Sequence, residues 1–165
     1  MVNIYDDKIW WDYLEEDLQE LLNESRTLLN KVEKWEEKFH DYAFIVFPTA
    51  KAYEGFLKKL FLDLGFITEK DYSGKRFRIG KALNPSLVVK YRNRGNVYGQ
   101  IINYCGGKEL ANELWDTWKS CRNRLFHWFP NEKNAISYVE AKQKVERVIN
   151  AIDMAHTECK IERNK

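Results

Sequence analysis

Residues 14–39, LEEDLQELLNESRTLLNKVEKWEEKF, decide what kind of fold this chain adopts. Apolar side chains recur there at alternating steps of four and three residues, which places them on one face of an α-helix. The stripe consists of Leu14, Leu18, Leu21, Ser25, Leu28, Val32, Trp35 and Phe39. Only Ser25 is polar, and the acidic residues fall on the other side. The pattern predicts a long amphipathic helix that packs on a bundle, extends it, or forms a coiled-coil seam.

Helical periodicity resumes after this segment. A second helix is predicted from about residue 44 to Gly65, with Pro48 either in its first turn or at a kink in a longer helix. A short helix is predicted at residues 97–104. The next helix has a predicted buried stripe formed by Leu110, Leu114, Trp118, Cys121 and Leu125. Because Pro130 disfavours helix at the residue before it, this helix should end near His127 or Trp128.

The last predicted helix begins after a loop, with Asn134 as its N-cap. Its buried stripe consists of Tyr138, Ala141, Val145, Val148 and Ile152. Residues 66–96 differ from the helices, because turn-forming dipeptides divide them and short strands are predicted at 77–79 and 87–89. The sequence therefore predicts an all-α bundle of four to five helices. An acidic helix at 1–38 precedes a domain at 39–165, which carries a basic loop or short hairpin at 66–96.

Composition excludes several classes of protein. The chain has 165 residues, of which 44% are hydrophobic and 15% aromatic, whereas disordered chains lack such residues. No run approaches the roughly 20 apolar residues of a membrane span, and no signal sequence is recognisable, so we expect no membrane partner and a cytoplasmic location. Three scattered cysteines, Cys105, Cys121 and Cys159, and three histidines suggest neither a disulfide framework nor a metal site. No cofactor is expected.

Charge is unevenly distributed although the formal net charge is only +2. Residues 1–38 hold eleven acidic and five basic residues, whereas residues 66–95 hold eight basic and two acidic ones. A local positive field of this kind favours a polyanionic partner such as RNA, since basic side chains neutralise phosphates and release counterions. A solvated basic loop with no partner is the alternative.

The candidate catalytic residues lie in residues 120–130, SCRNRLFHWFP. Five residues separate Arg122 from His127, so on an ideal helix their side chains would point roughly 140° apart. They converge only if the helix unwinds near His127, or if two copies of the chain meet across a two-fold axis. Histidine can exchange a proton near neutral pH, and arginine can hold phosphate oxygens. In RNA the 2′-hydroxyl can itself attack the phosphate, so such a pair needs no metal ion.

The string Arg122-Asn123-x-x-x-His127 is similar to the R-x4-6-H motif of HEPN-domain ribonucleases. Residues 44–57, FIVFPTAKAYEGFL, resemble the matching helix in the C-terminal HEPN domain of the RnlA/LsoA toxins. The resemblance covers roughly residues 40–155. It implies a metal-independent endoribonuclease that leaves a 2′,3′-cyclic phosphate and acts as a homodimer with a composite active site. It also implies a toxin or defence effector, which an antitoxin or another regulatory protein would restrain.

The resemblance further assigns a role to each residue of the site. His127 would be the acid and base, Arg122 the phosphate clamp, and Asn123 the residue that orients one of them. Glu54 would hold Arg122 or share proton transfer, and Lys51 would occupy the basic position that binds phosphate. The ammonium of a lysine lacks the planar, forked guanidinium of an arginine. Additional substrate-binding residues are expected at Arg124, Arg76, Arg78, Arg92 and Arg94.

Three alternatives stay open. Glu54 and Lys58 are four residues apart, so Glu54 can instead form a surface ion pair along its own helix. The protein can be a non-catalytic helical dimer module that binds RNA, a nucleotide or a partner protein. The acidic segment 1–38 can cover the basic segment in cis, or join two chains through its apolar stripe.

Overall fold

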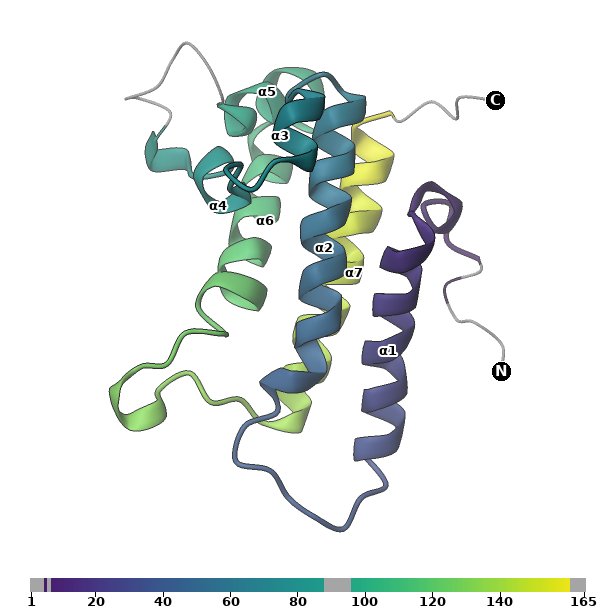
Figure 1. The fold of residues 1–165 in the computed structure, drawn as a ribbon, viewed down its shortest axis with the longest axis vertical. Helices are drawn as coiled ribbons and strands as arrows, with labels where there is room; N and C mark the ends of the chain where they lie inside the picture. The colour runs from purple at the N-terminus through teal and green to yellow at the C-terminus, as the bar shows by residue number, and fades with distance from the viewer. Residues whose placement is uncertain (1–4, 6, 88–95, 161–165) are drawn as a thin grey trace.

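The computed structural model describes residues 5, 7–87 and 96–160, and in these residues the fold is all-helical with no strand. Four long helices form a bundle, namely α1 (Glu16–Val32), α2 (Ala43–Asp63), α6 (Gly107–Trp118) and α7 (Tyr138–Glu158). Helix α2 lies in the middle, with α1 and α6 on either side and α7 behind it (Figure 1). The prediction of an all-α fold is confirmed.

Short helical segments precede or connect these four helices. The segment η1 (Trp11–Tyr13) precedes α1, and the connecting segments are α3 (Glu69–Ser73), α4 (Ile79–Ala82), η2 (Pro85–Leu87), α5 (Val97–Tyr104), η3 (Lys119–Asn123) and η4 (Pro130–Glu132). Within the ranges described, no helix combines the length and the apolar character that a membrane span needs. Helix α5 occupies the predicted residues 97–104.

Helix α1 is shorter than its apolar stripe. It ends at Val32, and Trp35 and Phe39 lie beyond it as exposed side chains in the connection to α2. Leu18 and Leu22 are buried with the side chains of the other long helices, so α1 shares their hydrophobic core. The prediction that the helix continues to residue 39 is wrong, because a backbone turn in which Trp35 N–H donates to Val32 O replaces the helical ladder.

Pro48 lies inside α2, and Ser25 of α1 compensates for it. A proline interrupts the helical hydrogen-bond ladder and leaves neighbouring backbone groups without partners. The Ser25 hydroxyl accepts from Thr49 N–H at 3.0 Å and donates to Ile45 C=O at 2.8 Å. The side chain of Ser25 is fully buried. The one polar residue in the α1 stripe therefore bridges the backbone at the proline in α2.

Gly65 ends α2 as predicted, with a φ of 69° in the left-handed region that favours glycine. The insertion that follows differs from the prediction. Residues 77–79 form no strand, because Ile79 begins helix α4, and Leu87 lies in η2 while residues 88 and 89 lie outside the described residues. A capping box between Thr68 and Asp71 starts α3 instead of a hairpin. The hairpin prediction is therefore wrong for the described part of the insertion.

The last helix begins three residues later than expected. Its N-cap is Ser137, which forms a capping box with Glu140. Asn134 does not cap this helix. Its side-chain amide instead donates to the carbonyl oxygens of Leu125, at 3.3 Å, and His127. Asn134 thus holds the backbone turn that follows Arg122.

Cys105 and Cys159 form a disulfide, although the sequence suggested no partner for either. Cys105 follows α5 and Cys159 follows α7, and these two helix ends lie at the same end of the bundle (Figure 1). Their Cα atoms are 4.3 Å apart across 54 residues of sequence. Only the fold brings them together. The sequence expectation of no disulfide is therefore wrong for this pair, and a disulfide is rare in the cytoplasm that we expected.

Candidate functional site

A π-helical turn positions Arg122. Helix α6 ends regularly at Trp118 and continues as the π turn η3, in which Arg124 N–H donates to Lys119 O at 3.0 Å, five residues back. The carbonyl of Ser120 is thereby released from the ladder and accepts from the Lys144 ammonium of α7 at 3.3 Å. Such turns widen a helix by one residue and recur at functional sites. The helix therefore does unwind, but it ends at Asn123, earlier than predicted.

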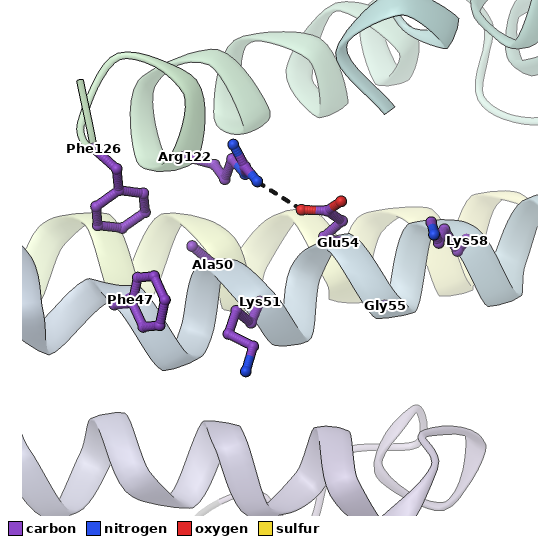
Figure 2. Close-up of a pocket in the computed structure, with 8 residues that line it drawn as sticks. All are labelled: Phe47, Ala50, Lys51, Glu54, Gly55, Lys58, Arg122 and Phe126. Carbon is purple, nitrogen blue, oxygen red and sulfur yellow. Dashed lines mark hydrogen bonds and ion pairs between the residues drawn. The ribbon is translucent and has the colours of Figure 1, made fainter. Parts of the chain in front are cut away.

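Arg122 faces α2 and forms an ion pair with Glu54. The guanidinium Nε lies 3.3 Å from the Glu54 carboxylate, and both side chains are partly exposed (Figure 2). Lys58 points elsewhere and lies 3.5 Å from the carbonyl oxygen of Tyr72. Of the two partners that the sequence left open for Glu54, the fold selects Arg122.

A pocket of about 490 Å³ surrounds this pair. Its walls are Phe47, Ala50, Lys51, Glu54, Gly55, Lys58, Arg122 and Phe126. The rings of Phe47 and Phe126 meet edge to face, with centroids 5.4 Å apart. Phe47 is 51% exposed, so one aromatic surface stays open to solvent. The pocket combines an apolar wall with basic groups.

Two lysines give the pocket its charge. The Lys51 ammonium lies 5.9 Å from the centroid of the Phe47 ring, and Lys58 contacts a backbone carbonyl. In the described part of the chain, neither ammonium pairs with a carboxylate. Arg122 lies over the Trp118 ring, at 6.0 Å from its centroid. A ligand that carries negative charge therefore meets cations that have few competing partners.

The predicted catalytic residues are only partly brought together. Arg122, Glu54 and Lys51 line one pocket. His127 is exposed on the turn after η3, and Asn123 is half-buried at the end of η3; neither side chain is among those that line the pocket. Within one chain, the predicted acid–base residue therefore does not line the pocket that contains the residues predicted to bind phosphate.

The predicted substrate-binding arginines lie outside the pocket. Arg124 is exposed and follows η3. Arg76 and Arg78 are exposed between α3 and α4, and the Arg78 guanidinium donates to the carbonyls of Lys75 and Phe77 in its own loop. Arg92 and Arg94 lie outside the described residues.

A second arginine–glutamate pair joins α6 to α7. Arg147 donates through Nε and Nη2 to both carboxylate oxygens of Glu113, at 3.0 and 3.2 Å, and through Nε to the Thr117 hydroxyl at 3.1 Å. Nearby, burial raises the pKa of the Cys121 thiol and of the Tyr53 hydroxyl, which donates to the Leu114 carbonyl. The Cys121 thiol and the Tyr53 hydroxyl are therefore neutral at physiological pH, and both side chains pack in the core.

The sequence prediction missed Phe47, Phe126 and Lys58. A signal for two of them exists, because Phe47, Lys51, Glu54 and Lys58 are spaced by four, three and four residues and share one helical face. Over the part of the chain that the structure describes, no group of three or more histidine, cysteine, aspartate or glutamate side chains is arranged to hold a metal ion.

Comparisons with models of known protein families, with curated proteins and with solved structures found no match to this chain.

Proposed function

We propose that this protein is a metal-independent endoribonuclease. The observation that carries the proposal is the Arg122–Glu54 pair in an open pocket that also contains Lys51. The pair uses only Nε of Arg122, so the terminal nitrogens, which donate to no other group in the described part of the chain, are left for a phosphate.

The reaction follows from the chemistry of RNA. The substrate's 2′-oxygen bonds to phosphorus, the bond from phosphorus to the 5′-oxygen breaks, and a 2′,3′-cyclic phosphate remains. A base takes the proton of the 2′-hydroxyl, and an acid protonates the departing 5′-oxygen. Arg122 stabilises the charge that develops on the phosphoryl oxygens, and Lys51 binds a neighbouring phosphate. Glu54 orients Arg122, Asn123 orients Arg122 or His127, and His127 transfers protons.

We further propose that the working form is a homodimer. His127 does not line the pocket of its own chain. The two residues that follow it are large and apolar and yet exposed to solvent, Trp128 at 76% and Phe129 at 41%. We propose that a second copy covers these side chains and that its His127 completes the Arg122 pocket. From the resemblance to toxin HEPN domains, we also propose that the protein acts as a toxin or defence effector that an antitoxin or another regulator restrains.

The test is cleavage of cellular RNA in EDTA by the wild type and by Arg122→Ala and His127→Ala variants. His40→Ala is the matched control, since His40 is also exposed and lies outside the pocket. The proposal predicts cleavage by the wild type and the control only. Equal cleavage by His127→Ala protein with unchanged circular dichroism would contradict it.

Mixing the two inactive variants tests the composite site. A heterodimer of Arg122→Ala and His127→Ala chains keeps one site with both residues intact, so mixing should restore part of the activity. Cleavage by the wild type without restoration in the mixture would assign both residues to one chain.

A non-catalytic binding module is the second candidate, and the position of His127 favours it. If the pocket only binds a phosphate-bearing ligand, the protein has no need of a proton donor inside it. This function predicts that RNA binds and stays intact, and that Arg122→Ala weakens binding whereas His127→Ala does not.

A further inference from the structure

We propose that the pocket holds one unpaired nucleobase of the RNA on the open face of Phe47, with the phosphates on its two sides bound by Lys51 and Arg122. The inference rests on the proposed function and adds how the substrate is selected. It assigns a substrate-binding role to Phe47 and Phe126, which the predicted set of site residues did not include.

The aromatic wall has the geometry of a stacking platform. Phe47 exposes half of its surface, and Phe126 supports the ring from its edge at a centroid distance of 5.4 Å. A base cannot insert between these two rings, because that would require centroids about 7 Å apart, twice the contact distance of carbon atoms. The base therefore stacks on the solvent-exposed surface of Phe47, beside the Lys51 ammonium that lies over the ring at 5.9 Å from its centroid. Every nucleobase offers such a face, so this contact tolerates sequence changes.

The cations lie on two sides of that wall. Figure 2 shows Arg122 approaching α2 from the side of α6, whereas the Lys51 side chain extends toward α1. A strand that crosses α2 between them would place successive phosphates near the two cations and the base on Phe47. Because Glu54 neutralises only part of the charge, Lys51, Lys58 and Arg122 leave the pocket attractive to a phosphodiester chain.

An unpaired nucleotide fits this pocket better than a duplex. A paired base has both faces covered by its neighbours and cannot reach an aromatic ring on a helix surface. The pocket volume of about 490 Å³ exceeds what a phosphate alone would occupy and lies in the range of small-ligand sites. The apolar wall would have no function for a bare phosphate.

The test measures binding and not cleavage. The ligands are two single-stranded oligomers of about six nucleotides, both with 2′-O-methyl sugars that prevent cleavage, one with uracil bases and one abasic throughout. Wild-type protein should bind the uracil oligomer about five- to a hundredfold more tightly than the abasic one, given the usual strength of base–aromatic stacking.

Phe47→Ala should remove that preference, and Phe47→Leu should remove most of it while keeping the packing against Phe126. Phe44→Ala is the matched control, because Phe44 is exposed on the same helix and does not line the pocket. Thermal melting confirms that each variant is folded. A preference that survives in Phe47→Ala protein, or equal binding of both oligomers by the wild type, would overturn the inference.

The outcome separates this inference from the ribonuclease proposal. If wild-type protein prefers the uracil oligomer through Phe47 and leaves ordinary RNA intact, the base site stands and the nuclease fails. If RNA is cleaved equally well by the wild type and by Phe47→Ala protein, and no base preference is measured, the nuclease stands and the base site fails.

Discussion

The two arginine–glutamate pairs of helix α6 and its π turn form an informative contrast. The side chains of Arg122 and Glu54 are 41% and 34% exposed, and those of Arg147 and Glu113 are 40% and 33% exposed. Exposure therefore does not distinguish them. Arg147 reaches both carboxylate oxygens and a hydroxyl, whereas Arg122 makes one contact of 3.3 Å. Arg147 therefore has its hydrogen-bond partners within the fold, whereas Arg122 has donors that form no such bond with the described residues.

Geometry explains why the pairs differ. Arg147 lies on α7 and reaches α6 across a regular helix contact, so its guanidinium meets Glu113 in a forked arrangement. Arg122 lies on the π turn, which directs it over the Trp118 ring toward α2. The contrast suggests that one pair belongs to the scaffold and the other to the site, and substitutions can separate these roles.

Replacement of each arginine by alanine should give the largest effects. Arg122→Ala should lower RNA cleavage about 10²–10³-fold, as expected for loss of a group that stabilises transition-state charge, with little change in melting temperature. Arg147→Ala should leave the cleavage rate of the folded protein unchanged and cost about 1–2 kcal/mol of stability, because Glu113 and Thr117 lose hydrogen bonds. Initial rates and thermal melts on the same samples provide the measurement. Loss of activity in both variants at equal stability would remove the distinction.

The disulfide should affect the scaffold alone. Replacing both Cys105 and Cys159 with serine removes a cross-link that spans 54 residues, and we expect a loss of about 4 kcal/mol in unfolding free energy. This corresponds to a drop of roughly 10 °C in melting temperature. Cleavage by the folded protein should persist, because the disulfide lies at the end of the bundle away from the π turn (Figure 1). The control is the wild type in reductant, which should melt like the variant; a variant as stable as the oxidised wild type would contradict the prediction.

Ser25→Ala should lower stability by about 1–3 kcal/mol, since Thr49 N–H and Ile45 C=O would lose their buried partner beside Pro48. Denaturant titration gives the value. Thr27→Ala serves as the control on the exposed side of the same helix. Equal stability of the two variants would mean that another group, such as water, forms the hydrogen bonds to Thr49 N–H and Ile45 C=O.

The smallest effect concerns acid. Hydrogen bonds from the Ser137 backbone and hydroxyl lower the pKa of Glu140 from its ordinary value of 4.5. A lowered folded-state pKa stabilises the protein above the unfolded value, and this contribution is lost as the pH falls below about 4.5 and through the folded value. The urea midpoint should therefore decrease less between neutral and acid pH in Glu140→Gln protein than in the wild type. Glu146→Gln, on the same helix, should behave like the wild type.

Periodicity predicted the long helices because it reports which side chains are buried. The predicted stripe from Leu110 to Leu125 is buried throughout, and Gly65 ends α2 where the left-handed conformation was expected. The prediction of a strand at 77–79 was wrong, because a short apolar run does not distinguish a strand from a buried helical turn. The sequence did not predict the disulfide for a different reason, because its two cysteines meet only through the arrangement of α5 and α7.

The site was predictable to the extent that it rests on local spacing. Arg122, Glu54 and Lys51 were named from two strings and lie in one pocket. Phe47 and Lys58 share their helical face and could have been found in the same way. Phe126 could not, because its position over Phe47 depends on how the π turn redirects the chain after Trp118. No sequence pattern signals that turn.

The chemical ends left on RNA test the proposed function most directly. Wild-type protein is incubated with a defined single-stranded RNA in EDTA, and the products are identified by mass spectrometry. The proposal predicts fragments that end in a 2′,3′-cyclic phosphate, paired with fragments that begin with a 5′-hydroxyl, and no such products from Arg122→Ala protein. Intact RNA, or fragments with 5′-phosphate ends that appear only when Mg²⁺ is added, would contradict it.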